Sequence, residues 1–201
     1  MAKEKLKRYN APYGLLKYPW IVKPNTKFNP DGVFQCKLVL PQDKAKGLIE
    51  LINGATDTYF NEVYNSTKKK DQGKLFKKYP YNAEYDSEEV ETGNIEFKFK
   101  CAKRVTTTDG KEYTFKVNVF DKYNAPIPED TFIATGSKGI INFSMRNYFV
   151  VATGMVGVTL QLNAVQVREL ITGGATAEAF GFEAEEGEEE VPPFDKGEDD
   201  F

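Results

Sequence analysis

The amino-acid sequence predicts a mainly β domain that carries one long helix and an acidic C-terminal tail. Stretches in which apolar and polar residues alternate recur along most of the 201 residues, and this alternation is typical of half-buried strands. One other stretch repeats its apolar residues at helical spacing. Beyond Thr172 the apolar patterns stop and carboxylates dominate, so we expect one folded domain over residues 1–172 and a disordered tail over 173–201.

The first elements predicted are two strands. Residues 14–23, GLLKYPWIVK, are apolar and aromatic but contain Pro19, so they predict an edge strand or an extended arm. Residues 33–40, VFQCKLVL, give a clear strand pattern that Pro41 ends. Cys36 and Cys101 both lie within strand patterns, and we therefore expect buried reduced thiols rather than a disulfide.

A helix follows the second strand. Asp43 stands before a long stretch whose apolar positions predict an amphipathic helix of about five or six turns, weakened by Gly54. The residues that recur at helical spacing are Leu48, Ile52, Ala55, Tyr59 and Val63.

The second half of the domain is again predicted to be β. Residues 68–93 show no sustained period and predict a long mobile excursion. Residues 94–105 and 111–121 alternate on either side of an Asp-Gly turn, which predicts a hairpin, and the final long strand covers residues 155–170. Several strands with one helix suit a five-stranded Greek-key barrel, the OB-fold, although a β-sandwich remains an alternative.

Charge is distributed unevenly between the domain and the tail. Residues 1–176 carry 26 Lys and Arg against 19 Asp and Glu, whereas residues 177–201 carry 1 against 11. This asymmetry fits a domain that binds a polyanion and carries an acidic mimic of its ligand, but it fits a solvating tail equally well.

The composition argues against an enzyme. The chain has no histidine, which removes the usual neutral-pH general base, the common nucleophilic triads and histidine-containing zinc sites. GSKG lacks the earlier glycine of a phosphate-binding loop, and most carboxylates lie in loops or in the tail. We expect no catalytic residue, no metal and no cofactor. We also expect a soluble protein, because no apolar stretch resembles a signal sequence or a membrane span.

Basic and aromatic residues are interleaved as binding of single-stranded nucleic acid requires, with cations for the phosphates and rings for the bases. Lys98 and Lys100 share the polar side of one predicted strand, and Lys116 would face them if the hairpin pairs along its length. Ordinary solvation is the alternative explanation of this lysine face. The candidate DNA-binding residues are Lys98, Lys100, Lys103, Arg104, Lys116, Arg146, Tyr148, Phe149, Trp20, Lys77 and Lys78.

Several motifs resemble one protein family. FKFKC, the VFD that follows it, GSKG and VATGMVGVTLQLNAVQVREL are similar to the single-stranded DNA-binding proteins of T-seven-like short-tailed phages. The resemblance runs from GVFQCKLVLP to Leu170 and resumes in the acidic tail that ends in phenylalanine. It implies an OB-fold whose strand order is interrupted by a long helix. It also implies binding of single-stranded DNA without sequence preference during phage replication and recombination.

The resemblance also implies roles for particular residues. The basic strand of the family matches Lys98 and Lys100, and its DNA-stacking tyrosine matches Tyr148. Two positions differ, because Val150 stands where the family has a second stacking ring, a tryptophan, and Ala102 stands where it has a tyrosine. As possible compensating rings the sequence offers Phe149, Tyr18 and Trp20.

The tail receives its role from the resemblance as well. In the family, such a tail is implied to occupy the DNA groove when DNA is absent, and its end to recruit the replicative DNA polymerase and the helicase-primase. The residues concerned here are Glu198, Asp199, Asp200 and Phe201. Carboxylates mimic phosphates and a ring mimics a stacked base, which agrees with this role. The expected location is the cytoplasm of the infected bacterial host, and the oligomeric state, homodimer included, stays open.

Two other function classes remain as alternatives. An OB-type RNA-binding or cold-shock-like module would share the groove but would prefer RNA through its 2′-hydroxyl groups. An acidic-tailed chaperone or scaffold protein would have a domain that binds no nucleic acid. Matched DNA and RNA oligonucleotides separate these alternatives.

Overall fold

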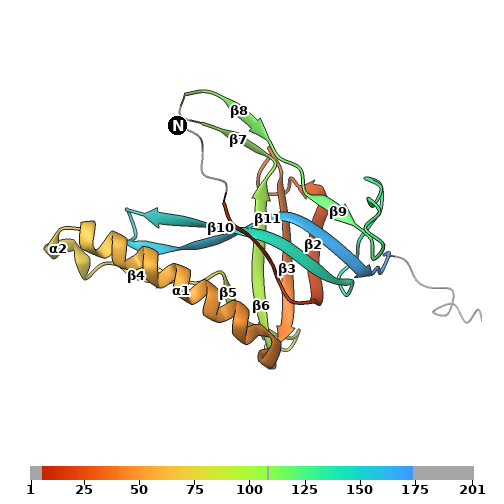
Figure 1. Ribbon diagram of the computed structural model, residues 1–201, viewed down its shortest axis with the longest axis horizontal. Coiled ribbons are helices and arrows are strands. Elements are labelled where there is room, and N and C mark those ends of the chain that lie inside the picture. Colours follow the sequence, from red (N-terminus) through yellow and green to blue (C-terminus); the bar gives the residue numbers. More distant parts are fainter. Residues whose placement is uncertain (1–5, 108, 174–201) are drawn as a thin grey trace, which may run out of the picture.

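The structure is a computed structural model that describes residues 6–107 and 109–173 (Figure 1). The tail residues Glu198, Asp199, Asp200 and Phe201 lie outside the described residues. The elements are β1 (Arg8–Asn10), β2 (Gly14–Asn25), β3 (Val33–Pro41), α1 (Gln42–Ser66), α2 (Lys69–Gln72), β4 (Phe76–Lys78), β5 (Tyr81–Tyr85), β6 (Glu91–Ala102), β7 (Arg104–Thr106), β8 (Glu112–Thr114), β9 (Asn118–Phe120), β10 (Lys138–Val150) and β11 (Met155–Glu169). The predicted mainly β architecture with one long helix is confirmed.

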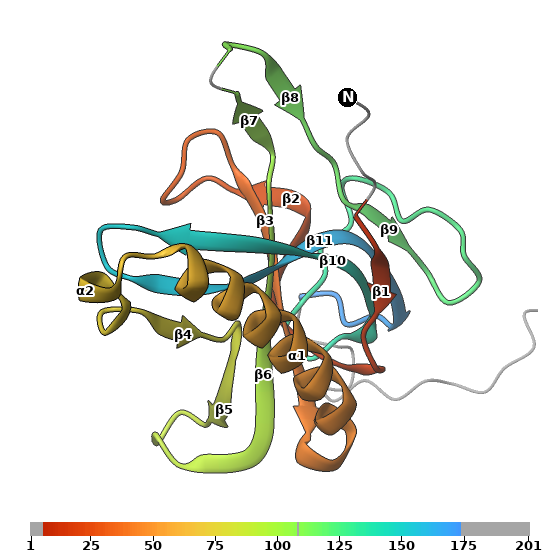
Figure 2. The same cartoon turned by 60° about the vertical axis from the view of Figure 1, so that its left-hand side comes forward.

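Five strands pair in a closed circuit. β2 pairs with β3, β3 with β6, β6 with β11, β11 with β10, and β10 with β2 again. Every pairing in the circuit is antiparallel except that of β6 with β11, which is parallel. The β10–β2 seam is short, because it joins only Lys138 to Leu15 and Gly139 to Gly14. The long β10–β11 hairpin extends beyond the circuit and lies along α1 (Figure 2).

The hydrophobic core fills the inside of this circuit. Alternate residues of each strand point inward, so that Phe97 and Phe99 on β6 lie beside Leu38 and Cys36 on β3. Phe143 on β10 packs edge-on against Phe99, with ring centroids 5.3 Å apart. Both cysteines are buried and free, as predicted, and burial raises the pKa of the Cys36 thiol.

Helix α1 covers one side of the sheet and is longer than predicted. It spans 25 residues, about seven turns, and packs mainly against β11. Its apolar stripe faces the strands, which confirms the amphipathic prediction. The buried residues of the helix are Ala45, Leu48, Ile52, Thr56 and Val63. No helix within residues 6–107 and 109–173 is both long and apolar enough to cross a membrane.

The predicted edge position of the first strand is wrong at its beginning, where β2 pairs with β10 at Gly14 and Leu15. β2 lies between β10 and β3 in the sheet. Pro19, which suggested an edge, instead lies where the β2–β3 register shifts between Lys17 and Trp20. A proline lacks the N–H group that a regular ladder needs, and a bulge inside a sheet accommodates this loss.

The predicted mobile excursion over residues 68–93 is also wrong. It contains α2, β4, β5 and the beginning of β6. β4 pairs in parallel with β11, and β5 pairs with β6. These strands are three and five residues long, which is too short for a clear apolar pattern. Pairing with β11 and β6 therefore keeps them in place.

The predicted hairpin forms only in part. Pairing is limited to Arg104–Thr106 with Glu112–Thr114, which make a separate two-stranded sheet that projects from the molecule (Figure 1). The chain then turns away, and β9 pairs in parallel with β11. Lys116 therefore does not face Lys98 and Lys100, whose neighbours are on β3 and β11.

Candidate nucleic-acid interface

Lys98 and Lys100 point outward from β6. Their inward neighbours Phe97 and Phe99 are in the core, and alternation along the strand places the lysines on the opposite, exposed face. Register aligns Lys98 with Lys37 on β3. The sequence-based placement of both lysines on the polar side of a strand is confirmed.

Tyr148 reaches the same face from β10. Its register partner on β11 is Gly157, and a Cβ atom at Gly157 would lie 2.9 Å from Tyr148 Oη. The same Cβ would lie 2.4 Å from the backbone carbonyl oxygen of Lys78 on β4. Gly157 therefore lets the tyrosine ring and β4 approach β11 together. Sequence reasoning missed this residue, although a glycine inside a strand signals a close approach.

These side chains line one groove, which we name the Tyr148 groove. Its walls carry Lys78, Lys98, Lys100 and Tyr148. Among the described residues, none of the three lysines forms an ion pair, so their charges are uncompensated there. Tyr148 is half-buried, and burial raises the pKa of its hydroxyl group. The groove therefore offers positive charge next to an aromatic ring. The remaining lining residues are Tyr79, Pro80, Val150, Met155, Val158, Thr159 and Leu160.

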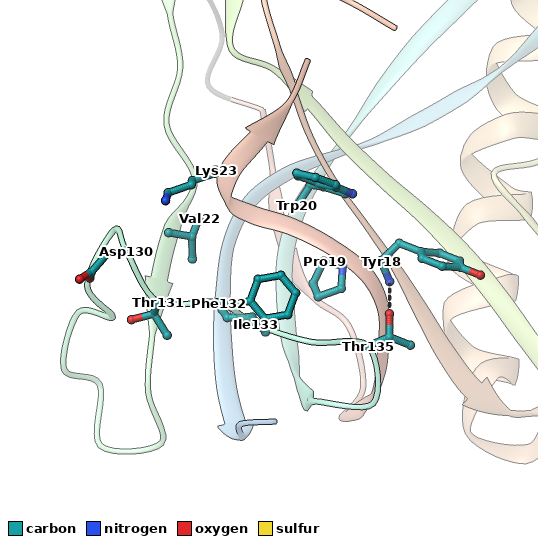
Figure 3. A pocket seen from close by; sticks show the side chains of 10 residues that line it. All are labelled: Tyr18, Pro19, Trp20, Val22, Lys23, Asp130, Thr131, Phe132, Ile133 and Thr135. Atoms are coloured by element: carbon teal, nitrogen blue, oxygen red, sulfur yellow. Dashed lines mark hydrogen bonds between the residues drawn. The ribbon is translucent and has the colours of Figure 1, made fainter. Parts of the chain in front are cut away.

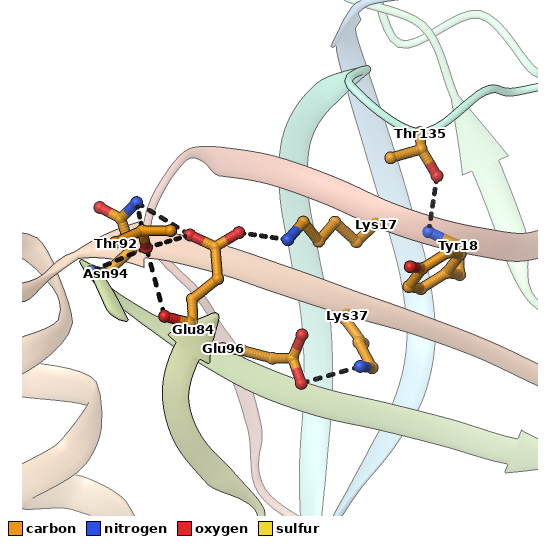
Figure 4. Close-up of polar contacts among 8 residues, drawn as sticks. All are labelled: Lys17, Tyr18, Lys37, Glu84, Thr92, Asn94, Glu96 and Thr135. Carbon is orange, nitrogen blue, oxygen red and sulfur yellow. Dashed lines mark hydrogen bonds and ion pairs between the residues drawn. The ribbon is translucent and has the colours of Figure 1, made fainter. Parts of the chain in front are cut away.

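Two other lysines on this face are neutralised. Lys37 Nζ lies 2.8 Å from Glu96 Oε1, and Lys17 forms an ion pair with Glu84 (Figure 4). Both glutamates are buried, and Glu84 is only 7% exposed.

The environment of Glu84 keeps it ionised. Its carboxylate accepts hydrogen bonds from Thr92 at 2.6 Å and from Asn94 at 2.9 Å (Figure 4). Burial, the largest influence, acts to raise the pKa of Glu84, but the hydrogen bonds from Lys17, Thr92 and Asn94 outweigh it and the pKa is lowered. This end of the face is therefore close to neutral.

Of three further candidates, Arg146 lies next to the groove, whereas Lys77 and Phe149 point away from it. Arg146 is on the outer face next to Thr159 of the groove wall, and its Nε donates a hydrogen bond to Gln161. Lys77 lies on the other side of β4, where its Nζ contacts Asp57 Oδ1 of α1 at 2.7 Å. Phe149 also points away from the groove, into a separate hollow near α2.

The candidates beyond the end of β6 form a different group. Lys103 and Lys116 line a second hollow together with Lys23. Lys116 is paired with Glu129, and Arg104 Nη1 lies 3.8 Å from Asp31 Oδ1. The structure therefore brings together Lys78, Lys98, Lys100, Tyr148 and Arg146, and it leaves Lys103, Arg104 and Lys116 apart from them.

Trp20 belongs to a third hollow, lined also by Phe132 from the β9–β10 connection (Figure 3). Trp20 is aligned with Gln35 of β3, which is aligned with Lys100 of β6.

No group of three or more His, Cys, Asp or Glu side chains that could hold a metal occurs among the described residues.

A mainly β domain with unpaired lysines and an aromatic ring in one groove is typical of proteins that bind single-stranded nucleic acid. The sequence profile of the family "Single-stranded DNA-binding protein, Bacteriophage T7" matches residues 9–170. The chain belongs to this family of bacteriophage single-stranded DNA-binding proteins, which is a family of binders and not of enzymes.

Solved structures show the same fold. The crystal structure of gp2.5, a single-stranded DNA-binding protein encoded by bacteriophage T7, has a TM-score of 0.65 and 23% identity. The match covers 92% of this chain and 98% of that one. The single-stranded DNA-binding protein of bacteriophage Enc34, truncated at its C-terminus, has a TM-score of 0.56 at 12% identity. The match covers 84% of this chain and 97% of that one.

The Enc34 protein in complex with single-stranded DNA gives a TM-score of 0.54 at 11% identity, covering 83% of this chain and 89% of that one. No curated protein sequence is similar enough to this chain to count as a relative.

Proposed function

We propose that this chain binds single-stranded DNA in the Tyr148 groove, without sequence preference. The observation that carries this proposal is the convergence of three unpaired lysines, Lys78, Lys98 and Lys100, beside Tyr148. The closed circuit of five strands supports an OB-type Greek-key barrel as the scaffold. Its short β10–β2 seam fits the partly open form of that barrel.

Binding is driven by two physical terms. Each lysine that neutralises a phosphate releases condensed counterions, which favours binding and makes it dependent on salt. Tyr148 provides a face on which one base stacks, and base stacking contributes about 1–3 kcal/mol. Every base has an aromatic face and every nucleotide a phosphate, so neither term distinguishes one sequence from another.

We infer the cellular role from family membership and from the composition of the tail. The chain acts in phage DNA replication and recombination, in the cytoplasm of the infected bacterium. The acidic tail competes with DNA for the positive groove, and its end, with Asp200 and Phe201, recruits the replicative polymerase and the helicase-primase. The large negative charge of residues 177–201 supports the first role, because it can neutralise the groove lysines.

Fluorescence anisotropy tests the proposal. Labelled oligo-dT, oligo-rU and duplex DNA are titrated with the full chain and with a truncation after Thr172, over a series of salt concentrations. We expect tightest binding to oligo-dT, a log–log salt slope near −0.7 per neutralised phosphate, and tighter binding after truncation. Tighter binding of oligo-rU than of oligo-dT favours an RNA-binding module, and an absence of binding by either form favours the chaperone or scaffold class.

The role of Tyr148 has its own test. Tyr148→Ala removes the half-buried ring that lines the groove and should weaken binding of oligo-dT about fivefold to a hundredfold. Phe149→Ala is the matched control, because its ring lies on the opposite side of β10. The control should leave the affinity of the folded protein unchanged, and an unchanged affinity of Tyr148→Ala contradicts the stacking role.

A further inference from the structure

Two exposed aromatic rings line a cleft that shares no lining residue with the Tyr148 groove. Trp20 on β2 is 46% exposed, and Phe132 from the β9–β10 connection is 64% exposed. Both line the same hollow, to which Tyr18 and Pro19 also contribute (Figure 3). Single exposed rings are common on protein surfaces, but several that meet in one hollow indicate a binding site.

The backbone beside this cleft is strained. Tyr18 has φ = +50°, a left-handed conformation that is unfavourable for a residue with a bulky side chain. It lies in the β2 bulge between Lys17 and Trp20, and its N–H group donates a hydrogen bond to Thr135 Oγ1 at 3.0 Å. Bulges redirect side chains, and strain of this kind is concentrated at functional sites. The bulge holds Tyr18 and Trp20 outward instead of burying them.

The cleft is aligned with the Tyr148 groove across the sheet. Trp20 is aligned with Gln35, and Gln35 with Lys100, which lines the groove. Neighbouring strands are about 4.8 Å apart, so Trp20 and Lys100 are separated by roughly 10 Å along this row. The three side chains lie on the same outer face, and a ligand that leaves the groove past Lys100 meets Trp20 next.

Charge also favours an anionic strand on this route. Lys23 lines the cleft and has no ion-pair partner among the described residues. Asp130 lies on the wall formed by the β9–β10 connection. Phosphates are therefore repelled from the Asp130 wall and attracted to the β2–β3 side, which leaves the aromatic centre of the cleft for bases.

We propose that the cleft formed by Trp20 and Phe132 is a second base-stacking site for single-stranded DNA, continuous with the Tyr148 groove through Lys100. This inference rests on the function proposed above and extends the path of the DNA strand across β6, β3 and β2. It also supplies a second stacking ring for a chain in which Val150 stands where the family has a tryptophan. Val150 lines the groove at that point, and Phe149 points away from it.

Intrinsic fluorescence reports directly on this cleft, because Trp20 is the only tryptophan of the chain. The full chain is titrated with unlabelled oligo-dT of about 16 nucleotides, the upper range of the site size of one OB-fold. We expect DNA to quench Trp20 emission in proportion to the bound fraction. A labelled oligonucleotide of the same length gives that fraction independently by anisotropy.

Two variants test whether the change in Trp20 emission arises from DNA bound in the cleft. Phe132→Ala removes one wall of the cleft but leaves the core intact, and it should weaken binding of the 16-nucleotide oligomer at least about fivefold and reduce the quenching. Tyr123→Ala is the matched control. Tyr123 is 77% exposed in the same connection but does not line the cleft, so its loss should change neither quantity.

The outcomes separate this inference from the proposed function. Binding seen by anisotropy without a change in Trp20 emission overturns the inference and leaves the Tyr148 groove as the binding site. An affinity of Phe132→Ala equal to that of the parent does the same. An absence of binding by anisotropy rejects the proposed function and the inference together.

Discussion

Two pairs of lysines on one face of the sheet differ in what lies beside them. Lys98 and Lys100 line the Tyr148 groove and have no ion-pair partner among the described residues. Lys37 on β3 and Lys17 on β2 are aligned with Lys98, and they contact the buried carboxylates of Glu96 and Glu84, respectively. The same alternation of lysine with apolar residues therefore gives a positive surface at one end and a neutral one at the other.

The position of the counter-charge decides this difference. Glu84 comes from β5, a strand whose partner is β6, and Glu96 is on β6 itself, two residues before Lys98. A lysine that already forms an ion pair gains little free energy by binding a phosphate, because it must first separate from its carboxylate. The unpaired lysines lose only water and counterions, so the DNA affinity should reside with them.

The largest expected effect on DNA affinity comes from replacing Lys98 and Lys100, the lysines of the groove that have no ion-pair partner among the described residues. Lys98→Ala combined with Lys100→Ala should lower the affinity for oligo-dT about a hundredfold, because two charge-assisted phosphate contacts are lost. The log–log salt slope should also become less negative by about 1.4. Lys37→Ala is the control and should lower the affinity less than about threefold. Equal losses in the two proteins, measured by anisotropy, contradict the comparison.

A smaller effect is expected from the support of Tyr148. In Gly157→Ala the new Cβ atom meets the Lys78 carbonyl and the tyrosine ring, so the affinity for oligo-dT should fall about tenfold as the stacked base is lost. Gly54→Ala is the matched control, since nothing lies within 4 Å of a Cβ there. The control should increase the free energy of unfolding by about 0.5–1 kcal/mol. Unchanged DNA affinity in Gly157→Ala contradicts a supporting role for this glycine.

The smallest effect on DNA affinity, close to none, is expected when Glu84 is replaced at the neutral end of the face, beside Lys17. Glu84→Gln should instead lower the free energy of unfolding by about 1–3 kcal/mol, because it leaves the amine of Lys17 without its carboxylate. Lys17 keeps 23% side-chain exposure, and the remaining hydration limits the loss. Glu62→Gln, at an exposed position of α1, is the control for denaturant unfolding at neutral pH.

The pH dependence of unfolding gives the sign of the Glu84 contribution. The pKa of Glu84 is lowered in the folded protein, so its stabilisation is complete above the ordinary glutamate pKa of about 4.3 and is lost as the pH falls through the lowered value. Glu84→Gln should lack this acid-dependent part. An identical acid-dependent part in the parent and in Glu84→Gln contradicts the assignment.

Local patterns in the sequence were sufficient for the long elements. β3, α1 and β11 each repeat apolar residues at a strand or helix period over at least nine residues, and all three were predicted close to their observed positions. β4 and β9 have three residues each, too few to show a period. Both are held by parallel pairing with β11, a partner far along the chain.

The candidate site shows the same limit. Lys98 and Lys100 could be placed on the exposed face because they lie on the polar side of a long strand, whereas Tyr148 was singled out by the family resemblance. Lys77 and Lys78 are adjacent in the sequence, yet Lys77 contacts Asp57 of α1 whereas Lys78 lines the groove. Which of the two points to the groove depends on how β4 pairs with β11, and this information is not local.

The β10–β2 seam, which joins residues 14 and 139, has a consequence for biosynthesis. At about 5–20 residues per second, a ribosome needs roughly 6–25 s to make the chain between these two residues. During that interval the growing chain exposes the open edge of β2, whose N–H and C=O groups can pair with another nascent chain. A message translated by several ribosomes at once therefore holds several such edges close together, and rapid translation shortens the time for which each stays open.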